Sequence, residues 1–250
     1  MSGRVIVVGL GPGDDALRTP QADAALAAAD DLIGYGPYLA RVRPLARQRR
    51  HPSDNGAELA RARLALTLAA EGRHVAVVSG GDAGVFGMAS AIFEAVDHGP
   101  ASWAMLEIDV VPGVSAMFAA AARAGAPLGH DFCAISLSDN LKSWDTISRR
   151  LRAAAEAGFV VALYNPSSRA RPWQLAAAFD LLRMILPATT PIVFARDITR
   201  PGERIEIVPL GEADASRADM RTLVLIGSAA TKLIAREGRA PRIYAPRSER

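Results

Sequence analysis

The stretch "VIVVGLGPGDDALRTP", residues 5–20, decides the class of fold. Residues 5–8 are a run of β-branched side chains, which predicts a buried strand. A glycine-rich turn follows, and then Thr19 and Pro20, which predict a helix with Thr19 as N-cap and Pro20 at its first position. The order of strand, glycine-rich turn and helix indicates the α/β class.

The turn differs from the fingerprint of a dinucleotide-binding fold. That fingerprint needs a glycine three residues after Gly11, and this chain has Asp14 there, whose carboxylate would repel a pyrophosphate. Pro12 lacks the N–H that a phosphate site uses, and the helix begins too late to point its N-terminus at phosphates. The loop therefore predicts a neutral or cationic ligand, with a plain strand-to-helix connection as the alternative.

Apolar runs and helical segments alternate as far as residue 125, which predicts an N-terminal α/β domain with a parallel sheet over residues 1–125. The expected strands cover residues 5–8, 31–33, 74–78 and 107–111. The expected helices cover residues 19–29, 55–70, 89–96 and 114–124.

Helices become less frequent after residue 125, and Pro201-Gly202 predicts a hairpin. We therefore expect a second α/β domain with a mixed sheet over residues 126–240. Its expected strands cover residues 133–137, 159–164, 191–196, 204–209 and 222–226, and its expected helices cover 144–157 and 172–186. Residues 241–250 carry two prolines and many charges, which predict a flexible tail.

The composition indicates a globular protein with a sizeable core, because 50% of the 250 residues are hydrophobic and 22% are charged. The net charge of +3 disfavours a nucleic-acid partner. The single cysteine, Cys133, excludes an internal disulfide and fits a reducing cytoplasm; with the histidines far apart in sequence, no metal site is expected. Neither a signal peptide nor a membrane-spanning run is visible, so we expect no membrane partner.

Two further loops resemble the first in following a strand. In "SGGDAGVFG", residues 79–87, four glycines permit close approach of a ligand, and Asp82 could accept hydrogen bonds from ribose hydroxyls or an ammonium group or else cap the next helix. In "VVPGVSAMF", residues 110–118, Pro112-Gly113 breaks a strand before Ser115. Parallel strands would bring the three loops to one sheet edge. A pocket of main-chain oxygens, one carboxylate and small residues suits S-adenosylmethionine, whose sulfur is positively charged.

The motifs "VGLGPGD" (residues 8–14), "SGGDAGVFG" (79–87) and "VVPGVSA" (110–116) resemble, in this order and spacing, the tetrapyrrole (corrin/porphyrin) methylases. The resemblance extends to about residue 235. It implies two α/β domains, a homodimer, and S-adenosylmethionine bound in the cleft between the domains. Ala83 departs from the pattern, since many members have a proline there.

Five segments are similar to the branch that methylates precorrin-3B at C17 and contracts the ring to precorrin-4 in cobalamin biosynthesis. They are "IGYGPYL" (33–39), "GDAGVFGMA" (81–89), "SLSDNLKSWDTISRRL" (136–151), "LYNPSSRARPWQL" (163–175) and "ARDITRPGE" (195–203). The resemblance also implies cofactor contacts, made mostly by main-chain atoms. These lie at Pro12, Gly80, Gly81, Asp82, Val85, Phe86, Ser115, Ala116, Tyr164, Asn165, Ala195, Arg196, Thr222 and Leu223.

Candidates for proton transfer or contact with the macrocycle follow from residue chemistry. They are Asp14, Tyr35, Tyr38 and His130. Candidates for binding the carboxylates of the substrate are Lys142, Arg169, Arg171 and Arg200. Each of these residues has an ordinary surface or packing role as its alternative.

Other functions stay open at this stage. The chain could be a sister methylase acting on another tetrapyrrole carbon or on the cobalt-containing intermediate, or a non-catalytic tetrapyrrole-binding protein. A nicotinamide dehydrogenase is disfavoured by Pro12 and Asp14.

Overall fold

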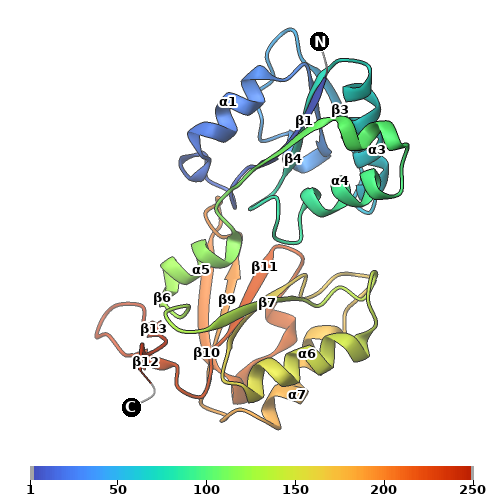
Figure 1. Ribbon diagram of the computed structural model, residues 1–250. Coiled ribbons are helices and arrows are strands. Elements are labelled where there is room, and N and C mark those ends of the chain that lie inside the picture. Colours follow the sequence, from blue (N-terminus) through green and yellow to red (C-terminus); the bar gives the residue numbers. More distant parts are fainter. Residues whose placement is uncertain (1–2, 249–250) are drawn as a thin grey trace. The chain divides into compact units, whose positions relative to one another are not determined.

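The computed structural model describes residues 3–248 and forms two compact units, which divide after Ala116 (Figure 1). This division lies earlier than the boundary at residues 125 and 126 that the sequence predicts. Helix α5 (Ala116–Ala124) is tied to the second unit, because the Met117 N–H donates to the Tyr164 hydroxyl oxygen at 3.2 Å and Arg242 donates to the Arg123 carbonyl. None of the helices within residues 3–248 is long and apolar enough to cross a membrane.

The first unit contains a five-stranded, fully parallel sheet, as the apolar runs predict. Its order is β3-β2-β4-β1-β5, with β1 at Arg4–Gly9, β2 at Asp31–Tyr35, β3 at Arg49–Ser53, β4 at His74–Ser79 and β5 at Glu107–Val111. Strand β3 was not predicted. Its sequence, RRHPS, has no apolar run because it forms an edge, where polar side chains and a proline are tolerated.

Helices cover both faces of this sheet. They are α1 (Pro20–Ala28), α2 (Gly36–Leu39), α3 (Glu58–Ala70) and α4 (Met88–Asp97), with short 3-10 helices η1 (Asp15–Leu17) and η2 (Ala101–Met105). Thr19 caps α1 as predicted, since its hydroxyl oxygen accepts from the Ala22 N–H at 3.1 Å. The helix expected from residue 55 begins three residues later, after Ala57.

Alternate residues of β1 point into two separate cores. Val5 and Val7 pack with α3 and α4, whereas Ile6 and Val8 pack with α1. This is the consequence of the two-residue repeat of a strand, and it explains why the whole run is apolar.

A buried carboxylate lies at the start of β2. Asp31 is fully buried; its Oδ1 is 2.8 Å from His51 Nε2, and its Oδ2 accepts from Arg73 Nε. Burial acts to raise the pKa of Asp31, but the hydrogen bonds and charges of Arg73 and His51 outweigh it and hold the pKa below the ordinary 3.8. The ionised Asp31 carboxylate therefore anchors the start of β2.

We expect Asp31→Asn to lower the free energy of unfolding by about 2 kcal/mol at neutral pH, because the two basic side chains lose their carboxylate. A depressed pKa means that this stabilisation is complete above pH 3.8 and is lost as the pH falls through the folded-state pKa. Urea unfolding should therefore show the difference shrinking below pH 3.8. Asp97→Asn is the control, since its side chain is 83% exposed. An unchanged difference at low pH would contradict the assignment.

The second unit contains a five-stranded mixed sheet, as predicted, in the order β10-β9-β11-β8-β7. The strands are β7 (Phe132–Ser136), β8 (Val160–Tyr164), β9 (Pro191–Arg196), β10 (Arg204–Pro209) and β11 (Thr222–Ile226). Strands β7 and β8 are parallel, and the other pairs are antiparallel. The predicted hairpin through Pro201-Gly202 joins β9 to β10, with Gly202 at a φ of 86°.

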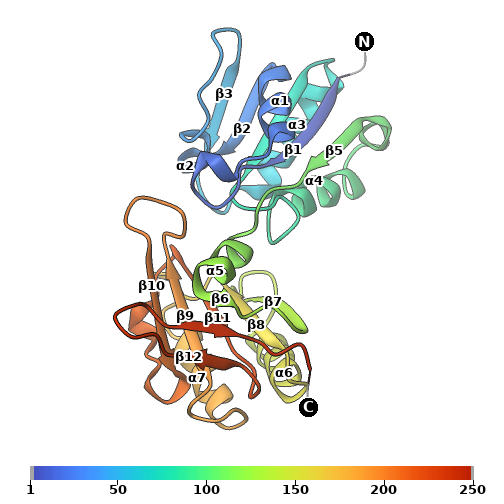
Figure 2. The same ribbon diagram turned by 90° about the vertical axis from the view of Figure 1, so that its left-hand side faces the viewer.

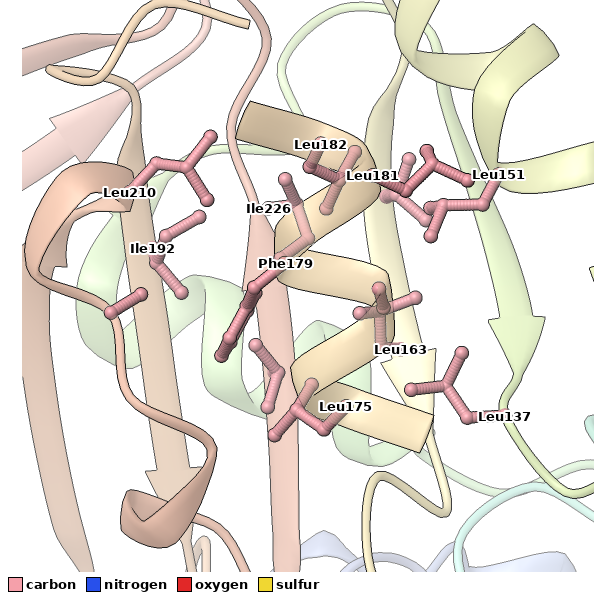
Figure 3. Close-up of a cluster of buried hydrophobic side chains, with 14 of the residues drawn as sticks. Leu137, Leu151, Leu163, Leu175, Phe179, Leu181, Leu182, Ile192, Leu210 and Ile226 are labelled. Carbon is pink, nitrogen blue, oxygen red and sulfur yellow. The ribbon is translucent and has the colours of Figure 1, made fainter. Parts of the chain in front are cut away.

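Helices α6 (Trp144–Glu156) and α7 (Gln174–Arg183) bury one face of this sheet. Leu175, Phe179 and Leu182 of α7 meet Leu163 and Ile226 of the strands (Figure 3). Short 3-10 helices lie at Leu210–Glu212 and Ala215–Arg217. The opposite face carries α5 and a small sheet, which Figure 2 shows in front of β9 and β11.

The small sheet corrects the prediction of a flexible tail. It has the order β12-β13-β6, with β12 at Lys232–Ile234, β13 at Arg242–Tyr244 and β6 at Gly125–Ala126. Ile243 is 1% exposed, and its main chain pairs with Gly125. A three-residue strand flanked by prolines has too little pattern to be recognised, so the charges dominated the prediction. Residues 249–250 of the predicted tail lie outside the described residues.

Candidate functional site

The three glycine-rich loops of the first unit meet at the carboxyl ends of β1, β4 and β5. Gly11 and Gly81 exchange two main-chain hydrogen bonds, of 3.1 Å from the Gly11 N–H and 2.9 Å from the Gly81 N–H. The Leu10 N–H donates to the Ser79 carbonyl at 2.9 Å. The adjacency that the parallel sheet predicts is therefore present, and direct hydrogen bonds join the first two loops. We call these loops, residues 9–14, 79–87 and 111–116, the loop cluster.

Close packing of main chain explains the glycines of the loop cluster. A Cβ atom on Gly113 would lie 2.4 Å from the Gly81 carbonyl oxygen and 2.9 Å from the Gly9 carbonyl carbon. A Cβ atom on Gly9 would lie 2.7 Å from the Gly113 nitrogen. No side chain fits between these segments without moving one of them.

Asp82 joins the second loop to the third. Its Oδ1 accepts from the Gly84 N–H at 2.8 Å, and its Oδ2 accepts from the Gly113 N–H at 2.9 Å. It does not cap α4, whose N-cap is Gly87. Each carboxylate oxygen holds one main-chain N–H and keeps a second acceptor site, so the hypothesis that Asp82 binds a ligand stays a prediction. The shape of the loop cluster depends on this side chain.

The first loop and the paired tyrosines border the second loop. Asp14 is exposed, and its Oδ1 accepts from the Ala16 N–H at 2.9 Å, capping η1. Pro12 is buried. Tyr35 and Tyr38 meet edge to face with ring centroids 5.3 Å apart, and the Tyr38 ring lies on Gly80, where a Cβ would be 2.6 Å from the ring. Tyr38 therefore supports the second loop, which the sequence did not indicate.

The remaining candidate residues of the first unit lie within the second and third loops. Val85 and Phe86 end the second loop; Phe86 is 51% exposed with a φ of 50°. Ser115 is 2% exposed and directly precedes α5, which begins at Ala116.

The candidates of the second unit share one edge of its sheet. Strands β8 and β9 are both antiparallel to β11, so their carboxyl ends lie where β11 begins. Arg196 pairs in register with Thr222, and Ala195 pairs with Leu223. Tyr164 ends β8 at the same edge. We call this set, with Asn165, the strand-end cluster.

Ion pairs and hydrogen bonds hold the strand-end cluster. Arg196 contacts Asp197 and Asp219, each at 2.9 Å, and Arg221 also binds Asp197, whose side chain is 1% exposed. Burial acts to raise the pKa of Asp219, but hydrogen bonds from the Arg221 main chain, Thr222 and Arg196 outweigh it and lower the pKa. The Asn165 amide donates to Ser136 Oγ at 2.9 Å. The Arg196 side chain is thus committed to internal pairs.

Strained backbone gathers in the same loops. Within residues 3–248, the non-glycine residues with left-handed backbone are Phe86, Asn165, Asp197 and Thr199. Phe86 follows β4, Asn165 follows β8, and the other two follow β9. Such conformations cost free energy and persist mostly where function requires them. All four residues therefore lie in loops that directly follow a strand, and three of them follow strands of the second unit.

The basic candidates lie on loops that leave the same edge of the second sheet. Lys142 follows β7, Arg169 and Arg171 follow β8, and Arg200 follows β9. Burial, together with the charge of Arg150, lowers the pKa of Lys142. His130, in contrast, precedes β7 and lies at the opposite edge, beside Asp131 at 3.7 Å. His130 therefore has no place in the strand-end cluster.

Among residues 3–248, no three His, Cys, Asp or Glu side chains are placed to hold a metal ion together.

The family model described as Tetrapyrrole (Corrin/Porphyrin) Methylases matches residues 4–214. The chain belongs to this family. The match includes all three glycine-rich loops of this methylase and the ends of β8 and β9.

Individual relatives agree with the family. The Precorrin-3B C(17)-methyltransferase of Sinorhizobium sp is 59% identical to this methylase over 247 residues, which are 99% of this chain and 97% of the relative. A crystal structure of the methyltransferase CobJ has a TM-score of 0.93 at 51% identity and covers 98% of this chain and 100% of its own. A structure of uroporphyrin-III C-methyl transferase from Thermus thermophilus, complexed with S-adenyl homocysteine, has a TM-score of 0.69 at 25% identity and covers 91% and 98%.

One residue of the methylase escaped the sequence analysis. Arg41 follows α2 and donates to the Leu10, Gly11 and Gly13 carbonyl oxygens at 2.8, 3.0 and 3.2 Å. The segment around it, ARVRPLARQRR, reads as a solvated basic stretch. The available signal was the glycine-rich loop itself, whose main-chain carbonyls need donors, and Gly11 of that loop lies 30 residues before Arg41.

Proposed function

We propose that this methylase transfers a methyl group from S-adenosylmethionine to C17 of precorrin-3B, with contraction of the macrocycle, in cobalamin biosynthesis. The observation that carries the proposal is the 59% identity to the Precorrin-3B C(17)-methyltransferase, which spans 99% of this chain and 97% of the relative. The bound S-adenyl homocysteine in the uroporphyrin-III enzyme supports S-adenosylmethionine as the methyl donor.

The loop cluster fits a ligand that packs against main chain. A Cβ added to Gly81 would make only ordinary van der Waals contacts, of 3.8 to 4.0 Å, with the third loop, and the residue has a φ of 69°. The half-exposed Phe86 ring offers an apolar surface on the same loop. We propose that Pro12, Gly80, Gly81, Val85 and Phe86 contact the donor, and that Asp82 shapes their loop.

Orientation is the main catalytic contribution of these loops. The bound donor supplies an electrophilic methyl group on a sulfonium, which must lie about 3 Å from the attacking carbon and in line with the departing sulfur. The hydrogen bonds between Gly11 and Gly81 and the carboxylate of Asp82 fix the loops before any ligand arrives. Fixed loops do not have to be ordered during binding, which lowers the cost of alignment.

Ring contraction needs proton transfer as well, since a hydroxyl proton is lost while a ring bond migrates. Asp14 is the best-placed carboxylate of the first loop, being exposed and held by the Ala16 N–H. We propose Asp14 as the proton acceptor and Tyr35 as a contact with the macrocycle. Lys142, Arg169, Arg171 and Arg200 are proposed to bind substrate carboxylates.

The strand-end cluster is proposed to bind a ligand through its main chain. Ala195, Leu223 and Thr222 are held by the sheet, and the side chain of Arg196 is held by Asp197 and Asp219. Main-chain groups at the strand ends, rather than these side chains, are therefore the proposed contacts.

Turnover tests the proposal directly. The purified protein is incubated with S-adenosylmethionine and precorrin-3B, and mass spectrometry should find a product heavier by one CH₂ together with one equivalent of S-adenosylhomocysteine. Parallel reactions contain uroporphyrinogen III or the cobalt-containing counterpart of precorrin-3B, and both should react more slowly. Faster turnover of either would assign another substrate, and binding without any methyl transfer would indicate a carrier.

We propose a homodimer as the working form. An exposed aromatic pair is available for contact, because Phe118 of α5 and Phe132 of the edge strand β7 meet edge to face at 6.2 Å and are 49% and 36% exposed. Light scattering should give twice the mass of the chain, and a monomer mass would contradict the proposal.

We propose a cytoplasmic location. Cys133 is the single cysteine of the chain and a free, half-buried thiol, so the fold contains no internal disulfide that an oxidising compartment would have to supply. Fractionation of cells that make a tagged chain would check this, and recovery outside the cytoplasm would contradict it.

A further inference from the structure

The Arg41 guanidinium contacts the first glycine-rich loop from outside it. Its Nη1 donates to the Gly11 carbonyl, and its Nη2 donates to the Leu10 and Gly13 carbonyls. Three carbonyls of a four-residue stretch thus point at one planar group. The backbone must curl around the guanidinium to allow this, and Gly11 does so with a φ of 70°.

The chemistry of the side chain suits this role. Arginine carries five N–H donors in a rigid plane and keeps its charge at all working pH values. A hydrogen bond from a charged donor is stronger than one between neutral groups. A lysine has one nitrogen, which cannot reach three separate carbonyls with the same geometry.

Arg41 also connects the loop to the tyrosines. The main-chain N–H of Arg41 donates to the main-chain carbonyl of Tyr38 at 3.1 Å, and the Tyr38 ring lies on Gly80 of the second loop. One short segment, residues 38–41, therefore supports the first loop with a guanidinium and the second loop with a ring.

We propose that Arg41 is a positioning residue for the methyl donor: it holds the first loop in its binding shape without contacting the reacting atoms. This inference rests on the proposed function. Without Arg41, the three carbonyls lose their shared donor and the loop samples other conformations. The donor must then order the loop when it binds, so affinity falls while the bound complex, once formed, reacts at a similar rate.

The test compares Arg41→Gln and Arg41→Lys with the wild type. Isothermal titration with S-adenosylhomocysteine should show a dissociation constant raised about tenfold in Arg41→Gln and by a smaller factor in Arg41→Lys. The KM for S-adenosylmethionine should rise similarly, with kcat at saturation within about twofold of wild type. Arg47→Gln is the matched control, because Arg47 is an exposed arginine that donates to one main-chain carbonyl, Ala27. Its dissociation constant should stay at the wild-type value.

Each other outcome has a definite meaning. A lower melting temperature with an unchanged dissociation constant would make Arg41 merely structural and overturn the inference, as would equal loss of kcat and kcat/KM. If Arg41→Gln does not fold, Arg41→Lys decides by the same comparison. Failure of the wild type to bind S-adenosylhomocysteine would overturn the proposed function. If Arg41→Gln binds it as tightly as the wild type does, only the role of Arg41 is overturned.

Discussion

Gly113→Ala is expected to raise the dissociation constant for S-adenosylhomocysteine by tenfold or more and to lower the free energy of unfolding by about 2 kcal/mol. The added methyl group would lie 2.4 Å from the Gly81 carbonyl oxygen, and the neighbouring atoms are main chain that cannot rotate away. The second and third loops must separate, which also pulls the Gly113 N–H from Asp82. Titration calorimetry and urea unfolding measure the two effects.

Gly36→Ala is the matched control for Gly113→Ala. No atom lies within 4 Å of a Cβ added to Gly36, so the same change in composition has no steric consequence. Its dissociation constant and unfolding curve should match the wild type. Ordinary binding by Gly113→Ala would show that the loops have more room than the structure gives them.

Asp82→Ala should weaken binding of S-adenosylhomocysteine by about tenfold or more, because two main-chain N–H groups lose their acceptor and the third loop is released. Asp82→Asn keeps one carbonyl oxygen and should lie between the alanine variant and the wild type. Calorimetry gives the affinities, and hydrogen exchange at Gly113 reports the released N–H.

Asp214→Ala controls for the loss of a local turn. Asp214 accepts from the N–H two residues along the chain, that of Ser216, as Asp82 does from Gly84. It belongs to the second unit, whereas the loop cluster belongs to the first. If Asp82→Ala accelerates hydrogen exchange at Gly113 but leaves the affinity for S-adenosylhomocysteine unchanged, the hydrogen bond from Gly113 to Asp82 is present but ligand binding does not depend on it.

The elements with strong apolar patterns could be predicted from sequence. Strand β1 and the capped start of α1 are examples, because a buried parallel strand and a Thr-Pro helix start each leave a clear local signal. Strands β3 and β13 could not be predicted, since an edge strand and a three-residue strand are defined by their partners.

The candidate site shows the same limit. Glycine-rich loops at strand ends were predictable because parallel topology brings such ends together. The contacts of Asp82, Tyr38 and Arg41 were not, because each joins loops that are distant in sequence. The sequence analysis did not foresee that the Asp82 carboxylate and several main-chain oxygens of these loops accept hydrogen bonds from within the protein.

The paired bonds between Gly11 and Gly81 have a mechanical consequence. An isolated antiparallel bridge joins the two loops that leave the neighbouring parallel strands β1 and β4, so a movement of one loop away from the other breaks two hydrogen bonds. The two loops are thus coupled to each other at the bridge. A ligand that packs against both loops therefore meets two segments whose mutual position is already set at this bridge.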